Sequence, residues 1–559
     1  MMETATTYPR DHHRSFLVVF AVGVLLILRV VYAFHFRFDT DEPQHLHVVW
    51  GWATGHTQYR EVFDNHGPLF HLCCVPLFWL LGERADLLVL MRLAMLPLLA
   101  LSLWSIFRLG STLRSREAGI WAVLLTAFYP EFFLTTTEFR TDDLWTLLWL
   151  LVLVVATRKV LGARHAFLAG LLLGMAFCVT VKTGLMIGAL VSASVIMILW
   201  RRFGTKEGAW NIPWKSFGVG LLGFAVAPGI VIASFVAAGS GRLLLYCNVQ
   251  HNLIPHTQNW AHYDAHLLWL PIFLGIVIAA VAATKGRVLS IASSQTVWLT
   301  LTAGFYFTAL KTLFPSLARQ DDLPFIPLVV LMFVLLFLHS RRALSSSRAG
   351  AWIARGFLPL LLVLEIAGLI VKAPPWKNDT KPEIAMMGDV LRATKPDDCV
   401  MDATGETVFR RRPYYYALET FTRTRIDNGL ITDDIAECMV ETHTAVVRIR
   451  DLTALSQAFV RNHYLPTGNG LWMLGKKLNK ERKILRQPMV VEIAVGAPYV
   501  VLDSFGKAVT GTWDDKVTEG APWLSAGRHT FVADPAANEA QWLFWALGFA
   551  RGFTPVHGN

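Results

Sequence analysis

Long apolar runs recur through the first two thirds of the chain, and short polar segments separate them. A helix that crosses a bilayer needs about 20 apolar residues, and the first such run covers about residues 16–36. We expect further spans near residues 86–109, 117–134, 142–158, 166–181, 183–200, 216–237, 266–284, 294–312, 323–340 and 356–372. The pattern predicts a mainly α fold, a polytopic membrane bundle of about eleven transmembrane helices.

One apolar run does not fit this set of spans. The segment GPLFHLCCVPLFWLLG is only about 16 residues long and contains Pro76. Because it is shorter than a membrane crossing, we expect a juxtamembrane helix that lies at the membrane surface.

The basic residues predict the orientation of the bundle. Cytoplasmic loops carry an excess of Lys and Arg, and here alternate loops hold the positive charge. These residues are Arg114 and Arg116; Arg158, Lys159 and Arg164; Arg201, Arg202 and Lys206; Lys285 and Arg287; Arg341, Arg342 and Arg348. The N-terminus is therefore expected inside, and an odd number of spans leaves the C-terminal region outside the cytoplasm.

The pattern changes at the segment PPWKNDTKPE, beyond which the chain is typical of a soluble protein. We expect three parts: a membrane domain at 1–372, a soluble α/β region at 373–480 and a β-rich C-terminal region at 481–559. In these extracytoplasmic regions Cys399 and Cys438 either form a disulfide or remain two free thiols.

Composition supports the membrane assignment. The chain is 54% hydrophobic and 16% charged, whereas about 25% of the residues in a soluble protein are charged. The net charge of +10 could suggest nucleic-acid binding, but the basic residues fall in short clusters without interleaved aromatic residues. We expect membrane lipid and no nucleic acid as a partner.

Acidic residues in the predicted outer loops are candidates for catalysis. Asp41 and Glu42 follow the first span directly, and Asp64 and His66 precede the surface helix. The alternative interpretation is a solvated loop in which Asp41 begins a helix.

Charged residues at the ends of later spans are costly in a membrane and so are functional candidates. They are Arg140 and Asp142 in TTTEFRTDDLW, Lys182 in FCVTVKTG, and Arg319 in SLARQDDLP. Helix capping, a simple salt bridge or a snorkelling lysine would each explain part of this set without a function.

Histidines are frequent in the outer loop YCNVQHNLIPHTQNWAHYDAH, which has the composition of a substrate-contacting lid. Three of them, His251, His256 and His262, lack a regular helical spacing with a supporting acid, so no metal site is expected there.

One chemistry accounts for both sets of charges. A carboxylate can act as general base on an acceptor hydroxyl, and cations can stabilise a phosphate that gains charge as it leaves. A lipid-linked phosphosugar would place its phosphate at this depth. A polytopic transporter or flippase for a lipid-linked or anionic substrate is the alternative, although no internal repeat is evident.

The same residues carry a family resemblance. The Asp41-Glu42 pair and GHTQYREVFDNHGPLFHL are similar to the first external loop of the GT-C glycosyltransferases. The nearest branch is formed by the bacterial relatives of protein O-mannosyltransferases, including the lipid A aminoarabinose transferase and Rgt-type lipopolysaccharide transferases. EFRTDDLWTLLWLL, AGLLLGMAFCVTVKTG and ARQDDLPFIPLVVLM follow in the family's order, so the resemblance covers about residues 15–340.

The resemblance implies a hexosyl- or pentosyltransferase that uses a polyprenyl-phosphate sugar and inverts the anomeric carbon. It implies action at the outer face of the inner (plasma) membrane, on a lipid, glycan or protein acceptor. By position it implies Asp41 as catalytic base, Glu42 as its support and Asp142 as a second catalytic acid. The implied substrate-binding residues are Asp64, His66, Arg140, Lys182 and Arg319, with no metal and no cofactor. His66 stands where the aminoarabinose transferase has a lysine.

Overall fold

The computed structural model of the 559-residue chain forms two compact units, each assembled from separate stretches of sequence. The helical unit comprises Met1–Arg37, Met91–Ser234 and His256–Asn378, and the mixed unit comprises Phe38–Leu90, Phe235–Pro255 and Asp379–Asn559. The structure describes residues 12–158, 162–204, 214–253, 294–314, 318–344, 347–478, 488–517, 520–534 and 540–555.

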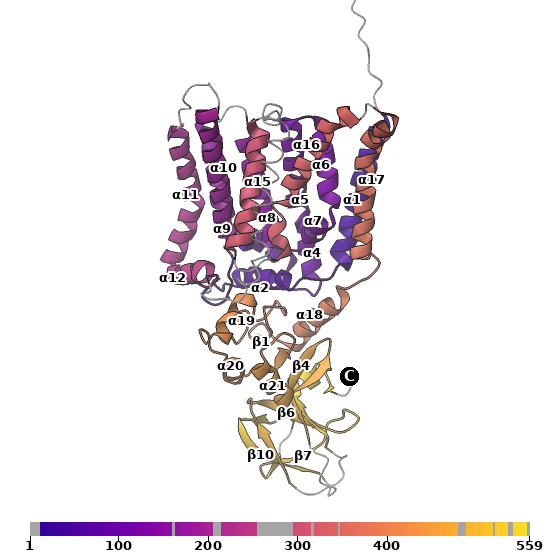
Figure 1. The fold of residues 1–559 in the computed structure, drawn as a ribbon. Helices are drawn as coiled ribbons and strands as arrows, with labels where there is room; N and C mark the ends of the chain where they lie inside the picture. The colour runs from indigo at the N-terminus through magenta and orange to yellow at the C-terminus, as the bar shows by residue number, and fades with distance from the viewer. Residues whose placement is uncertain are drawn as a thin grey trace, which may run out of the picture. The chain divides into compact units, whose positions relative to one another are not determined.

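Apolar helices make up the helical unit, and they lie side by side in Figure 1. They are α1 (His12–His35), α5 (Leu96–Leu113), α6 (Arg116–Phe128), α7 (Pro130–Thr135), α8 (Thr141–Ala156), α9 (Ala163–Val179), α10 (Thr183–Gly204), α11 (Trp214–Ala237), α15 (Ser294–Leu313), α16 (Ile326–Leu344) and α17 (Arg348–Lys372). Helix α4 (Leu87–Ala94) leads into α5, and a 3₁₀ turn, η3 (Arg319–Asp322), precedes α16. Helix α8 packs against α5 and α9, and α10 packs against α15.

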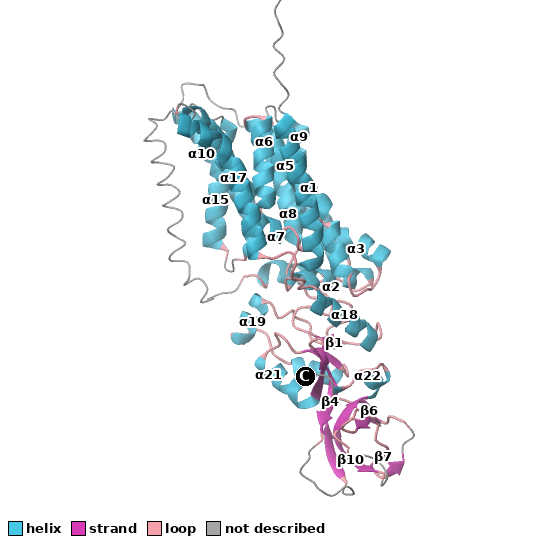
Figure 2. Cartoon of the chain, turned by 90° about the vertical axis from the view of Figure 1, so that its right-hand side faces the viewer, coloured by secondary structure: helices cyan, strands magenta, loops and turns pink. Residues whose placement is uncertain are grey.

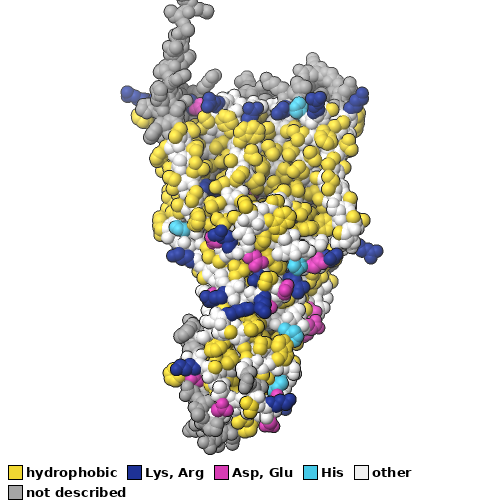
Figure 3. Space-filling model, turned by 180° about the vertical axis from the view of Figure 1, so that it is seen from behind, with side chains coloured by type: hydrophobic (Ala, Val, Ile, Leu, Met, Phe, Trp, Pro, Cys, Tyr) yellow, Lys and Arg dark blue, Asp and Glu magenta, His cyan; other side chains and the backbone are white. Residues whose placement is uncertain are grey.

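Length and hydropathy identify this unit as membrane-embedded. Among the described residues, five helices or helix pairs are long and apolar enough to cross a membrane: Val18–His35, Leu87–Leu113, Thr183–Trp200, Trp214–Ala237 and Arg348–Lys372. Large apolar side chains are exposed on them, and on the face shown in Figure 3 hydrophobic side chains cover most of the unit. The chain is a multi-pass membrane protein, while eleven spans remain a prediction. The span expected at 266–284 lies outside the described residues.

The expected span at 117–134 consists of two helices. Helix α6 ends at Phe128, and Tyr129 leaves the helical conformation with φ −55° and ψ 118° before Pro130 begins α7. The cause is local, because proline disfavours the helical conformation in the residue before it. Phe128 and Phe133, one from each helix, are both buried in a cluster with α1 and α17.

Helix α1 contains a buried cation. The guanidinium of Arg29 donates hydrogen bonds to the Phe133 carbonyl at 2.8 Å and to Thr137 Oγ1 at 3.1 Å. Its carbon Cζ also lies 4.0 Å from the centre of the Phe133 ring. These contacts connect α1 to the α7 segment.

The mixed unit combines short helices with two sheets, and Figure 2 shows the strands near the C-terminus. The helices are α2 (Asp41–Ala53), α3 (Leu69–Leu81), α12 (Gly241–Leu245), α18 (Lys381–Ala393), α19 (Thr420–Asp427), α20 (Ile435–Glu441), α21 (Ala454–His463) and α22 (Ala546–Ala550), with a π-helix, η1 (Tyr246–Gln250). The expected surface helix is α3, although its position on a membrane remains a prediction.

Eleven described strands form the sheets: β1 (Val400–Met401), β2 (Val446–Arg448), β3 (Tyr464–Gly468), β4 (Leu471–Lys477), β5 (Met489–Ile493), β6 (Ala497–Leu502), β7 (Gly511–Trp513), β8 (Lys516–Val517), β9 (Trp523–Leu524), β10 (Gly527–Ala533) and β11 (Trp542–Trp545). The larger sheet has the order β1-β2-β4-β11-β6-β9, with β3 beside β4, and the smaller has the order β5-β10-β7-β8. Since β4 pairs with β11, residues on both sides of position 480 build one sheet.

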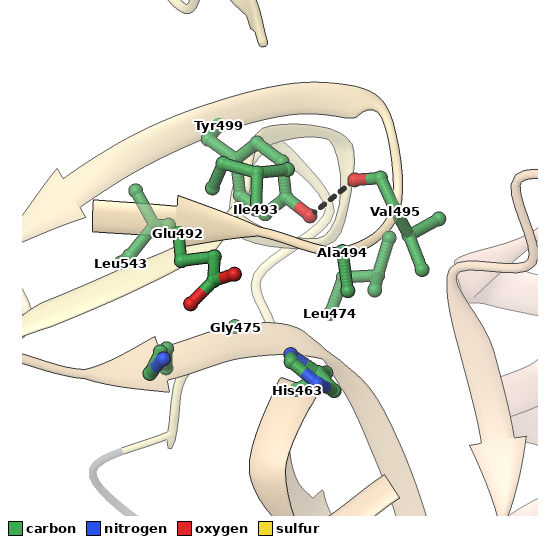
Figure 4. Close-up of a pocket in the computed structure, with 10 residues that line it drawn as sticks. His463, Leu474, Gly475, Glu492, Ile493, Ala494, Val495, Tyr499 and Leu543 are labelled. Carbon is green, nitrogen blue, oxygen red and sulfur yellow. Dashed lines mark hydrogen bonds between the residues drawn. The ribbon is translucent and has the colours of Figure 1, made fainter. Parts of the chain in front are cut away.

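A small pocket lies where β4, β5 and β6 meet (Figure 4). His463, Lys476 and Glu492 provide its charged or titratable lining. The hydroxyl of Tyr499 donates to the Val495 carbonyl at 2.8 Å and closes one side of the pocket. Burial lowers the pKa of His463, with a further contribution from Lys476.

Within the mixed unit, the first-loop segment packs on the C-terminal region. His47 of α2 donates through Nδ1 to the Val408 carbonyl at 2.7 Å, and the Tyr415 hydroxyl donates to the Tyr59 carbonyl at 2.5 Å. Buried Arg410 pairs with Glu83 at 3.0 Å. The loop that includes Val408 and Tyr415 therefore supports α2, which carries the first pair of candidate acids.

Candidate functional site

The start of α2 separates the roles of its two acids. Glu42 is fully buried, and its Oε1 accepts the backbone N–H of Asp39 at 2.8 Å. The Glu42 N–H in turn donates to the Asp39 carbonyl at 3.2 Å. Pro43 is suited to this first turn because proline is tolerated there. Glu42 thus holds the turn, and Asp41, which is half-buried, is the more exposed of the two acids.

Asp64 and His66 form a second group, on the loop between α2 and α3. The Asp64 carboxylate is buried and accepts from Gln58 Nε2 at 2.7 Å and from His66 Nδ1 at 2.9 Å. The Tyr59 hydroxyl donates to the His66 carbonyl at 2.6 Å. These bonds fix both the backbone and the ring of His66.

Two further histidines, which the sequence did not single out, join this group. His45 of α2 and His71 of α3 are fully buried, with 3.2 Å between His45 Nδ1 and His71 Nε2. His71 Nδ1 lies 3.6 Å from Asp64 Oδ2. One signal for His45 was available, since it follows Asp41 by four residues and so lies one helical turn later.

Helix α8 begins with the next group, which belongs to the helical unit. Arg140 is buried, and its Nε lies 3.3 Å from Asp142 Oδ2, while its Nη1 lies 3.4 Å from Glu138 Oε2. Two acids in the first turn suit a helix N-terminus. The salt-bridge interpretation of Arg140 is therefore confirmed, and a role in substrate binding remains a prediction.

Lys182 lies in the turn between α9 and α10 and pairs with Asp321 of η3. Asp321 is fully buried, and its Oδ2 also accepts the Ala318 N–H at 2.9 Å. Asp142 and Arg140 both act electrostatically on Lys182. The structure thus brings together three of the predicted site residues and adds Asp321, which the sequence analysis did not select.

Arg319 is the most accessible of the three predicted cations. Its side chain is 46% exposed, against 17% for Lys182 and 3% for Arg140. Its Nη1 lies 3.6 Å from Glu131 Oε1 of α7, and Lys372 of α17 pairs with the same carboxylate.

His251 has a contact that explains its burial. Its Nε2 lies 2.9 Å from Oε1 of Glu419, whose carboxylate also caps the N-terminus of α19. The ring of Tyr416 stacks on His251 with centroids 6.2 Å apart. His256 and His262, from the same expected lid, lie outside the described residues.

The structure also decides between the two alternatives for the cysteines of the C-terminal region, a disulfide or two free thiols. Cys399 and Cys438 are both free thiols. Burial raises the pKa of each thiol, and nearby carboxylates add to the rise, whereas Arg411 opposes it at Cys399.

Comparison with known proteins shows which family and which fold the chain resembles. Residues 66–251 match the family model described as dolichyl-phosphate-mannose-protein mannosyltransferase. No curated protein sequence matches the chain. Apo ArnT from Cupriavidus metallidurans shares the fold with a TM-score of 0.56 at 13% identity, over 83% of this chain and 98% of that one.

The same ArnT bound to undecaprenyl phosphate matches with a TM-score of 0.56 at 12% identity, over 82% of this chain and 98% of that one. At such low identity these structures establish the fold. The family match begins at His66 and includes Arg140, Asp142 and Lys182, whereas Asp41, Glu42, Asp64 and Arg319 lie outside it. The chain accordingly has a GT-C-like fold, shared with ArnT, and its residues 66–251 are similar to the dolichyl-phosphate-mannose-protein mannosyltransferase family.

Proposed function

We propose that this protein transfers a sugar from a polyprenyl-phosphate donor to a glycan, lipid or protein acceptor on the outer face of the inner membrane. One observation carries the proposal: buried charges meet at the ends of apolar helices, in Arg140, Asp142, Lys182 and Asp321. Ionisable side chains at such positions carry a free-energy cost in a membrane, and they typically mark sites that bind a substrate or an ion. The undecaprenyl phosphate in the ArnT structure supports a polyprenyl phosphate as leaving group.

In this proposal Asp41 accepts the proton of the acceptor hydroxyl. The acceptor oxygen attacks the anomeric carbon as the bond between that carbon and the phosphate oxygen breaks, so the configuration inverts. Polyprenyl phosphate leaves with the bonding electron pair. General base catalysis of this kind contributes about 10²–10⁴-fold to a rate.

The leaving phosphate needs positive charge, and Arg319 is proposed to supply it because its guanidinium is the most exposed of the candidates. Lys182 and Arg140 then position Asp321 and Asp142 through their ion pairs. His66, whose ring Asp64 orients, is proposed to contact the donor.

Replacement of the proposed base tests the function. In cells that lack the protein, a lipid-linked sugar should accumulate and an envelope glycan should lose one residue, as measured by mass spectrometry. The wild-type chain should reverse both changes. Asp41→Asn should not, because an amide cannot accept the proton, although it should reach the membrane in normal amounts.

Asp86→Asn is the matched control, since Asp86 is an acid of the same segment whose partner, Arg84, is exposed. It should behave as the wild type. Full activity of Asp41→Asn would remove Asp41 from the mechanism. A purified chain that moves the lipid-linked sugar across a vesicle membrane, and forms no glycosidic bond, would instead establish the transporter.

A further inference from the structure

Three potential metal ligands converge in the mixed unit, on the first-loop segment. His45 comes from α2, and Asp64 and His66 come from the loop before α3. One ligand atom from each residue can be chosen so that all three lie within 4.8 Å of one another. His45 and Asp64 are fully buried, and His66 is partly exposed, so the group is closed on the protein side and open at one edge.

We propose that His45, Asp64 and His66 bind one divalent transition-metal ion, with zinc as the ion that suits them best. Two imidazoles and one carboxylate form a ligand set typical of zinc, whereas calcium and magnesium prefer oxygen ligands throughout. Three protein ligands leave a fourth tetrahedral position for water. Binding of the ion does not depend on the proposed sugar transfer.

The distance between Asp64 and His66 allows an ion with little rearrangement of these two residues. Zinc lies about 2.0–2.2 Å from nitrogen and oxygen ligands, so two ligand atoms of one tetrahedral ion lie about 3.3 Å apart. His66 Nδ1 and Asp64 Oδ1 are 2.9 Å apart. An ion would replace the hydrogen bond between them and separate the two atoms by about 0.4 Å, less than a typical rotamer change requires.

Neighbouring groups already orient the ligands. Gln58 Nε2 donates to Asp64 Oδ2 at 2.7 Å, and His45 Nδ1 lies 3.2 Å from His71 Nε2. Metal-binding carboxylates and imidazoles are usually held in this way by a second polar partner. With its Nδ1 engaged by His71, His45 faces the ion through Nε2.

The sequence analysis expected no metal, because the family resemblance implied none and the histidines His251, His256 and His262 lacked a ligand spacing. The three proposed ligands come from positions 45, 64 and 66, so no short motif joins them. An ion here would cross-link α2 to the loop of His66. It would therefore hold the start of α2, which carries Asp41, against the following segment.

Direct metal analysis tests the site. The full chain, without a histidine tag, is purified in detergent, stripped with a chelator, incubated with zinc sulfate and desalted. Mass spectrometry of the elements should find about one zinc per chain. Asp64→Asn and His45→Gln should each weaken zinc binding at least 100-fold in a competition titration with a chromophoric chelator.

The control variant is His56→Gln, because His56 lies in the same segment, contacts Thr54 and is outside the proposed ligand set. It should bind zinc as the wild type does. Cobalt(II) added to the stripped wild-type chain should give visible absorption typical of four-coordinate cobalt. This second measurement uses the unaltered chain and so does not depend on the folding of a variant.

A wild-type chain that retains no zinc and gives no such cobalt spectrum would overturn the inference. So would unchanged zinc affinity in both ligand variants, since the ion would then bind elsewhere. Because these measurements follow the ion and not the sugar, they separate the two proposals. A chain that transfers sugar without binding zinc refutes only the metal site.

Discussion

Replacement of Gly405 by alanine tests whether the C-terminal region holds α2 in place. Gly405 has φ +98°, a conformation that strains any residue with a side chain. A Cβ at this position would lie 2.9 Å from His47 Cβ and 3.0 Å from His47 Cγ. His47 cannot turn away without losing its bond to the Val408 carbonyl. An alanine at position 405 would therefore displace α2 through its contact with His47.

The expected cost has two parts. A positive φ costs a residue other than glycine about 1–2 kcal/mol, and overpacking in a filled site costs about 1–3 kcal/mol. Gly405→Ala should thus destabilise the packing around α2 by about 2–5 kcal/mol.

Gly429→Ala is the matched control. Gly429 also has a positive φ, +68°, but a Cβ there would meet no atom within 4 Å. It should cost only the conformational part, about 1–2 kcal/mol. The difference of about 1–3 kcal/mol corresponds to about a 5- to 150-fold change in an opening equilibrium.

Hydrogen–deuterium exchange of the full chain in detergent measures this opening. Backbone amides of Asp41–Ala53 should exchange faster in Gly405→Ala, by the factor given above, than in Gly429→Ala. Sugar transfer should fall in parallel, since α2 carries the proposed base. If the two variants exchanged alike in α2, the contact with His47 would not support the helix, and the reasoning would be wrong.

Two further predictions concern charges in the C-terminal region. Arg448→Met should destabilise the larger sheet by about 3–5 kcal/mol, because buried Arg448 pairs with two carboxylates: half-buried Glu383, at 2.5 and 2.9 Å, and buried Glu406, at 2.9 Å. Arg84→Met is the control, because it breaks an exposed pair with Asp86 whose bonds are also 2.5 and 2.9 Å. It should leave hydrogen–deuterium exchange of the β2 amides unchanged, and faster exchange in β2 equal to that of Arg448→Met would contradict the burial argument. Burial lowers the pKa of His529, but its hydrogen bonds and the charge of the Asp514 carboxylate together outweigh this effect and raise the pKa above its ordinary value. The stabilisation by this pair is therefore complete below about pH 6.5 and is lost as the pH rises through the raised pKa. Histidine C2-hydrogen exchange, followed by mass spectrometry, should show His529 titrating above pH 6.5 in the wild type and lower in Asp514→Asn, and no difference would refute the assignment.

Hydropathy located the apolar helices, because burial in lipid requires long apolar runs that any window can detect. Hydropathy did not detect the break at Tyr129, because the residues on both sides are apolar and a hydropathy window averages over them as one segment. Pro130 was the available signal. The GT-C fold itself followed from the resemblance of the loops and not from periodicity, which identifies helices but not their arrangement.

The sequence predicted which types of residue form the candidate site, but not which of them contact one another. Asp64 and His66 are two positions apart, so their contact could be expected. Lys182 and Asp321 are 139 positions apart, and only tertiary packing decides that they meet. The same holds for His45, whose neighbours come from another helix and a loop.

Arg29 also constrains how the protein is made. Its hydrogen-bond partners, Phe133 and Thr137, follow it by 104 and 108 residues. At about 5–20 residues per second, the ribosome needs about 5–20 s to synthesise them after α1. During that interval the apolar span carries an unpaired cation, which costs about 2.5–3.5 kcal/mol near the middle of a bilayer. The first helix therefore carries this cost until the α7 segment is synthesised and its Phe133 carbonyl and Thr137 hydroxyl can accept from Arg29.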